Sequence, residues 1–160
     1  MKNFKVFGIS LLFSSFINAD SISNYNNSLL NYEKNIEECK NQSYKEFKDI
    51  PPLDVSEEDM RTALSYFIIK TAEDCSEKTR LILKKSINAI QNDLTIAETI
   101  RFHSRDILEL IKDSDKMISK AKQDFMSLDG KTKKKLKKIE AYQRPFDPTM
   151  AIDHYLGHKD

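Results

Sequence analysis

The stretch IRFHSRDILELIKDSDKMISKAKQDFMSL, residues 100–128, carries a regular apolar pattern. The pattern recurs every three or four residues, and seven of its nine positions are apolar: Ile100, Ser104, Ile107, Ile111, Ser114, Ile118, Ala121, Phe125 and Leu128. An average spacing of 3.5 residues is typical of a coiled-coil seam. The sequence therefore predicts one long helix that buries a single apolar seam.

The flanking residues predict where this helix begins and ends. Thr95 and Glu98 have the spacing of a capping box, and Gly130 is the residue type that commonly stops a helix. A helix from Ile96 to Leu128 would be about 50 Å long, whereas a compact sphere of this chain length is under about 40 Å across. Either the helix is kinked or the molecule is elongated.

The composition favours helices throughout. The chain has 160 residues with only three glycines and four prolines, too few turn residues for an all-β fold. Its length suits one domain with its own core. We expect an all-α fold, an elongated helical bundle of about four to five helices with one disulfide.

A first helix is predicted upstream of the paired prolines at 51 and 52. Its apolar stripe has spacings of three and four residues: Ile22, Tyr25, Leu29, Tyr32, Ile36 and Cys39. The helix should end between Cys39 and Phe47. Because Pro51 and Pro52 exclude a helix, the segment around them should be an extended connection.

A second helix should follow Ser56, which has the character of an N-cap with acidic residues after it. Its predicted inward face consists of Met60, Leu64, Phe67, Ile68 and Ala72. A further apolar series continues at Leu83, Ile87, Ile90 and Leu94. Around residues 74–76 the helix could break or bend, because Ser76 could act as a second cap. The pattern therefore leaves open whether residues 57–94 form one helix or two.

The chain has two cysteines, Cys39 and Cys75, and an oxidising compartment would favour one disulfide between them. In a simple hairpin turning near Pro51, Cys39 would face a residue near position 65, about 15 Å from Cys75. A disulfide therefore requires residues 40–56 to run back along the second helix.

Residues 1–19 have the three parts of a secretory signal peptide. Two lysines precede an uncharged run from Val6 to Ile17, and Ala19 offers a cleavage site. The run is too short to cross a bilayer, so we expect cleavage without stable membrane insertion, and a periplasmic or secreted protein. Residues 20–143 are the predicted helical domain.

Residues 144–160 are predicted to be a C-terminal tail with one short helix. Asp147 should cap it, Pro148 should be its first residue and Gly157 should end it. The expected apolar contacts of this helix are Met150, Ile152, Tyr155 and Leu156.

The sequence offers little for catalysis. His154 and His158 have an i, i+4 spacing that can bind a metal, but no third ligand is apparent. His103, Asp106 and Glu109 share a face of the long helix, where such residues are usually solvated. We therefore expect no enzyme, no metal and no cofactor.

The segment KTKKKLKK, residues 131–138, is the strongest charged feature. It predicts a basic interaction surface made of Lys131, Lys133, Lys134, Lys135, Lys137 and Lys138. No aromatic residues alternate with these lysines, and only Leu136, Ile139 and Tyr142 could hold the segment to the core. An acidic protein surface fits better than nucleic acid or a membrane, and a merely solvated helix is the alternative.

These features favour a non-catalytic exported protein that binds other proteins. We expect an assembly, secretion or chaperone-like factor, for example in pilus or secretion-system biogenesis. The alternative is a periplasmic inhibitor or immunity protein against a toxin or hydrolase. The seam at 100–128 could also pair two copies of the chain.

Overall fold

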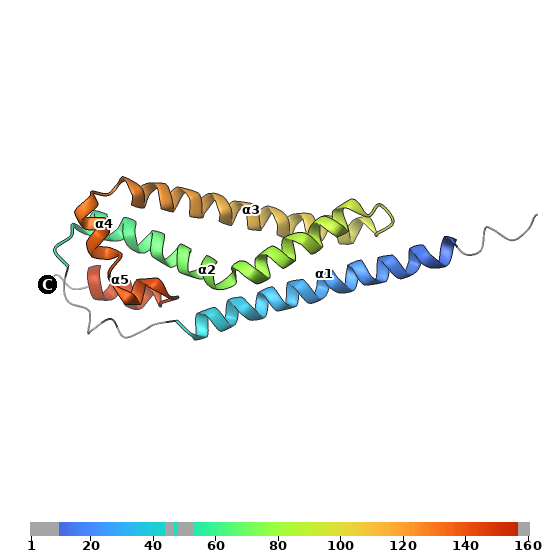
Figure 1. Ribbon diagram of the computed structural model, residues 1–160, viewed down its shortest axis with the longest axis horizontal. Coiled ribbons are helices and arrows are strands. Elements are labelled where there is room, and N and C mark those ends of the chain that lie inside the picture. The colour runs from blue at the N-terminus through green and yellow to red at the C-terminus, as the bar shows by residue number, and fades with distance from the viewer. Residues whose placement is uncertain (1–9, 44–46, 48–52, 157–160) are drawn as a thin grey trace, which may run out of the picture.

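A computed structural model describes residues 10–43, 47 and 53–156. Its regular elements are α1 (Ser10–Asn41), α2 (Glu57–Asn92), α3 (Glu98–Ser127), α4 (Gly130–Leu136), the 3-10 helix η2 (Glu140–Gln143) and α5 (Pro148–Leu156). Figure 1 shows three long helices side by side, with α4 and α5 gathered at one end. The predicted all-α, elongated bundle is confirmed.

The first helix ends where the sequence predicted, because α1 stops at Asn41. Cys39 is joined to Cys75 in a disulfide with the two Cα atoms 6.2 Å apart, so the expected pairing is confirmed. Phe47 is buried beside the first half of α2. The position of Phe47 therefore agrees with a connection that returns along α2, as the disulfide required.

The structure answers the question left open for residues 57–94, because α2 is one helix of 36 residues. Ser56 is its N-cap and accepts a 3.1 Å hydrogen bond from the Asp59 backbone amide, as predicted. Figure 1 shows α2 bending near its middle. There the hydroxyls of Thr71 and Ser76 donate to the carbonyls of the residues four positions earlier, an arrangement that often bends helices.

The bend accompanies a change of the buried face of α2. The first half buries Met60, Ala63, Leu64, Phe67 and Thr71, whereas the second half buries Ser76, Arg80, Leu83, Ile87 and Ile90. At 100° per residue these two sets lie on nearly opposite sides of the helix. The predicted contact at Ala72 is wrong, since Ala72 is exposed and its neighbour Thr71 is buried instead.

The seam of α3 is largely confirmed. Ser104, Ile111, Ala121 and Phe125 are buried, and most other seam positions are partly buried. Ser114 is the exception, because it is exposed while the next residue, Asp115, faces α2. These side chains pack within one chain, so they do not offer a face to a second copy.

The predicted bounds of this helix, Ile96 and Leu128, lie within two residues of the observed ones, but both predicted capping residues are wrong. Ala97 is the N-cap of α3 and has no side-chain cap hydrogen bond. Thr95 instead donates its backbone amide to the Asp93 carboxylate, a local turn that replaces the expected capping box. Gly130 does not end α3 either. The helix stops at Ser127, and Gly130 is already the first residue of α4 because Asp129 caps that helix.

Two groups of buried side chains form the core. The aromatic cluster lies at the α4–α5 end and consists of Phe47, Met60, Ala63, Leu64, Phe67, Phe125, Leu136, Ala141, Tyr142, Phe146 and Ala151. The aliphatic cluster lies at the other end, between the three long helices, and consists of Tyr25, Leu83, Ile87, Ile90, Ile96 and Ile111.

The C-terminal helix joins the aromatic cluster. Asp147 caps α5 by accepting from the backbone amides of Thr149 and Met150, as predicted. Ala151 is fully buried and Tyr155 packs against the cluster. The contacts expected of Met150 and Ile152 are wrong, since both are more than 40% exposed. A short helix can bury only one narrow face, and here residues 151 and 155 form that face. Gly157, His158 and the Leu156 side chain lie outside the described residues.

Candidate functional site

An ionic network lies between the two clusters, at the middle of the bundle. Its centre is Arg80 of α2, which is 9% exposed and binds both Glu73 of α2 and Asp115 of α3. Lys84 adds a 2.7 Å ion pair to Asp115. The network and the neighbouring disulfide tie α1, α2 and α3 together where the apolar core is interrupted.

Two groups at this network, Asp115 and Tyr32, have altered pKa values. Burial opposes ionisation of Asp115, but the hydrogen bonds and charges of Lys84 and Arg80 outweigh it and lower the pKa of the carboxyl group. Burial raises the pKa of Tyr32, with opposing smaller effects from Arg80 and Asp115. Asp115 is therefore ionised and Tyr32 neutral near neutral pH, which suits a structural network rather than proton transfer.

The lysine-rich segment is held against the aromatic cluster by a helix cap and by buried side chains. Asp129 accepts hydrogen bonds from the backbone amides of Lys131 and Thr132, which fixes the start of α4. Leu136 is fully buried, and Tyr142 is fully buried after it. Ile139 packs against the same cluster, so all three expected apolar anchors are in contact with the core.

Three of the six predicted surface lysines are used inside the molecule. Lys133 Nζ donates to the Met126 carbonyl at 2.6 Å, near the end of α3. Lys135 Nζ binds the Asp54 carbonyl at 2.9 Å, which ties α4 to the start of α2. Lys137 Nζ lies 5.8 Å from the centre of the Phe125 ring, a cation–π contact.

The other three lysines make no such contact with the described residues. Lys131, Lys134 and Lys138 are exposed, and their ammonium groups form no ion pair with the described residues. Lys131 and Lys134 share a face of α4 opposite Leu136, and Lys138 follows in the next turn. We name these three residues the lysine face.

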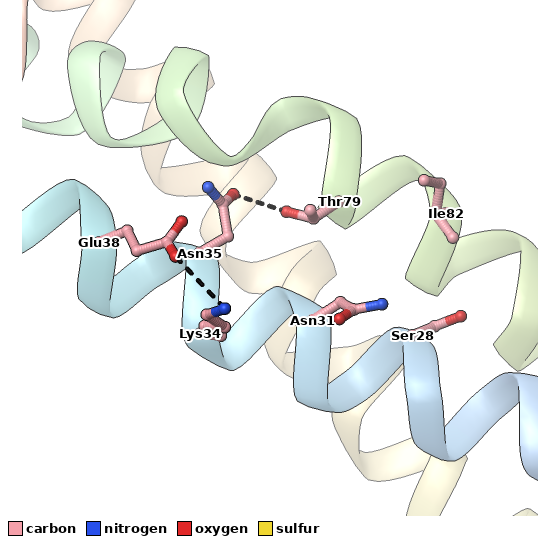
Figure 2. A pocket seen from close by; sticks show the side chains of 7 residues that line it. All are labelled: Ser28, Asn31, Lys34, Asn35, Glu38, Thr79 and Ile82. Carbon is pink, nitrogen blue, oxygen red and sulfur yellow. Dashed lines mark hydrogen bonds and ion pairs between the residues drawn. The ribbon is translucent and has the colours of Figure 1, made fainter.

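A second candidate surface is a groove between α1 and the second half of α2. Figure 2 shows it lined by Ser28, Asn31, Lys34, Asn35 and Glu38 of α1 with Thr79 and Ile82 of α2. Its volume is about 290 Å³. The Thr79 hydroxyl donates to Asn35 Oδ1 at 2.7 Å. At the rim, Lys34 Nζ lies 3.8 Å from Glu38 Oε1. We name this the amide groove.

Sequence reasoning missed the amide groove. Its available signal was the asparagines at positions 31 and 35, one helical turn apart and beside the predicted apolar stripe of the first helix. Which helix would pack beside them could not be read from the local pattern, because that depends on the disulfide and on the turn of the chain.

The remaining candidate residues stay apart. His103, Asp106 and Glu109 are all exposed on α3, as expected of a solvated face. His154 is exposed and its ring lies against Tyr155, with the centroids 4.6 Å apart. Within the part of the chain that the structure describes, no three His, Cys, Asp or Glu residues are grouped as a metal site.

The predicted signal peptide, residues 1–19, overlaps the first part of α1. The helix begins at Ser10 and continues past Ala19, the expected cleavage site. Among the residues whose side chains the structure describes, Ile22 is the first that packs against either cluster, so cleavage after Ala19 would leave the described core intact. Among the described residues, no helix combines the length and the apolar character needed to cross a membrane.

In comparisons with known proteins, no family model, curated protein or solved structure matches the chain. The functional assignment therefore depends on the surfaces described above.

Proposed function

We propose that this is a non-catalytic exported protein that binds another protein, as an assembly, secretion or chaperone-like factor. The observation that carries the proposal is the lysine face. Asp129 and the buried Leu136 hold α4 in place, while Lys131, Lys134 and Lys138 project from it without internal ion partners among the described residues. Such a fixed group of charges fits a partner with an acidic surface.

The three lysines that make contacts inside the molecule support this assignment. Lys133, Lys135 and Lys137 fasten α4 to α3, to the start of α2 and to Phe125. Their charges therefore position the segment, and the number of lysines in KTKKKLKK overstates the number available for a partner. Because the lysine face is small, we expect salt-sensitive, moderate binding.

Partner capture from cells that export the protein tests the proposal. We expect chemical crosslinking of the purified complex to yield one partner at a constant ratio, and the capture to weaken with rising salt. A variant with Lys131→Gln, Lys134→Gln and Lys138→Gln should lose that partner. The matched control changes Lys112, Lys116 and Lys120, three exposed lysines of α3, to Gln and should keep it. Equal capture by the two variants would count against the lysine face.

A periplasmic inhibitor or immunity protein is the second candidate, and the disulfide between Cys39 and Cys75 favours it. Inhibitors of this kind need a rigid binding surface, since rigidity lowers the entropy lost on binding. This function predicts a tight one-to-one complex with a toxin or hydrolase, which would be inactive in that complex. A captured partner that is active when bound excludes it.

A further inference from the structure

We infer that the amide groove binds an extended polypeptide segment of a partner protein through the backbone of that segment. The inference rests on the proposed function, because it names how a partner chain would be held. It concerns a surface that differs from the lysine face in both position and chemistry.

The first argument is the chemistry of the lining. A carboxamide presents both a hydrogen-bond donor and an acceptor, which is the same pair that a peptide backbone presents. Asn31 and Asn35 place two such groups one turn apart along α1. Figure 2 shows both amides on the side of α1 that borders the groove.

The second argument is that Asn35 is held in one orientation. The Thr79 hydroxyl donates to Asn35 Oδ1, and the Asn35 amide nitrogen points to the other side of the side chain in Figure 2. That nitrogen can therefore donate to a ligand carbonyl without breaking the contact between α1 and α2. A donor fixed before binding loses little entropy when the ligand arrives.

The third argument is the spacing. Residues i and i+4 of a helix are separated by about 6 Å along its axis. Alternate residues of an extended chain are about 6.7 Å apart, and only alternate residues present their backbone groups in the same direction. Asn31 and Asn35 therefore match the backbone groups of two alternate residues, i and i+2, of a strand that lies parallel to α1.

The groove also sets limits on length and side chains. From Ser28 to Glu38 it follows α1 for about 15 Å, which accommodates four or five extended residues. Ile82, which is 47% exposed, offers a single apolar contact at one end, and Lys34 and Glu38 offer opposite charges at the rim. With so few side-chain contacts, recognition should tolerate many sequences.

A titration with a defined peptide tests this inference. The probe is a capped heptapeptide of alternating serine and valine, added to the purified disulfide-bonded protein and followed by backbone NMR. We expect shifts centred on residues 31, 35 and 79. The Asn31→Ala and Asn35→Ala variants should each weaken binding about fivefold, since one hydrogen bond contributes about 1 kcal/mol.

Two controls make the test specific. Asn88→Ala changes an exposed asparagine of α2 on the side away from the groove and should bind as the unchanged protein does. The same heptapeptide with methylated backbone nitrogens cannot donate to the carboxamide oxygen of Asn31, so it should bind about fivefold more weakly. No shifts in the groove up to the solubility limit of the peptide would overturn the inference. Equal binding of the methylated peptide would also overturn it.

The two proposals can fail separately. The lysine-face variant should bind the heptapeptide normally, because its changes lie on α4 at the other end of the bundle. If the heptapeptide does not bind but the lysine-face variant still fails to capture the partner, only the groove inference is wrong. If the peptide binds but the lysine face does not affect partner capture, only the proposed lysine contact is wrong.

Discussion

The two ends of the bundle are built differently. The aliphatic cluster consists mainly of isoleucines and leucines on three long helices, whereas the aromatic cluster draws Phe47, Tyr142 and Phe146 from shorter segments. One helix, α2, serves both ends because it bends near Thr71 and Ser76 and changes its buried face. Each end then presents its own surface, the amide groove beside one cluster and the lysine face on the other.

The largest effect should come from the aromatic end. Phe125 is 0% exposed, and its ring is stacked against Tyr66 with the ring centroids 4.5 Å apart. Phe125→Ala should lower the free energy of unfolding by about 3–5 kcal/mol, because it leaves a cavity among packed rings. Denaturant unfolding measures the change.

Met126→Ala is the matched control, since this neighbouring side chain is 53% exposed. It should change the free energy of unfolding by less than about 0.5 kcal/mol. If the two substitutions cost the same, the aromatic cluster does not stabilise its end of the molecule.

The second effect concerns the disulfide, which lies where the two ends meet. Cys39 and Cys75 are 36 residues apart, and closing such a loop stabilises by about 4 kcal/mol in the chain-entropy model. Cys39→Ser, Cys75→Ser and the double variant should therefore lose nearly equal free energy of unfolding. Clearly additive losses would show that the two thiols are not paired in the folded protein.

The third effect concerns the ionic network. Arg80→Met removes the partner of Glu73 and one of the two partners of Asp115 while keeping most of the side-chain volume. We expect the free energy of unfolding to fall by about 2–3 kcal/mol. Lys85→Met, at an exposed position of the same helix, should have little effect. Similar losses in the two variants, measured by thermal unfolding, would mean that the network contributes nothing beyond the packing of its side chains.

The network also predicts an acid dependence. The pKa of Asp115 is lower in the folded protein than its usual value of 3.8, so its stabilising effect is present above that value. The effect is lost as pH falls through the lower, folded-state pKa. As pH falls below about 4, the free energy of unfolding of Asp115→Asn should therefore decrease less than that of the unchanged protein. Denaturant titration at each pH measures the two decreases. An unchanged acid profile in the variant contradicts this role.

The smallest effect on stability should come from the lysine face. Changing Lys131, Lys134 and Lys138 to Gln should alter the free energy of unfolding by no more than about 0.5 kcal/mol, because the three ammonium groups face solvent. The same variant should show the largest change in partner binding. A large loss of stability would instead place these lysines among the contacts that hold α4.

The difference between the two ends also explains what could be predicted from sequence. Regular periodicity on long helices identified Tyr25, Leu83 and Ile111 of the aliphatic cluster. The roles of Phe47 and Phe146 could not be predicted, because no helical period relates them and their burial depends on how the chain returns along α2. For a related reason, the sequence could not decide between a break and a bend of the second helix near Ser76, and the structure has a bend (Figure 1). The bend follows from side-chain hydrogen bonds of Thr71 and Ser76 to the backbone, which leave no trace in an apolar pattern.

The candidate sites divide in the same way. The lysine run was visible in the sequence. Its separation into three lysines with contacts inside the molecule and three without depends on Met126, Asp54 and Phe125, which are contributed by other elements. The pairing of Asn35 with Thr79 joins residues 44 positions apart and needed the packed helices to appear.

The most direct test of the central claim, that this protein acts by binding another protein through the lysine face, is site-specific photocrosslinking in living cells. A photoreactive residue in place of Lys134 should crosslink to one discrete partner protein, and the same residue in place of Lys116 on α3 should not. Crosslinking from position 116 but not from position 134 would contradict the claim, as would the absence of any crosslinked protein from position 134.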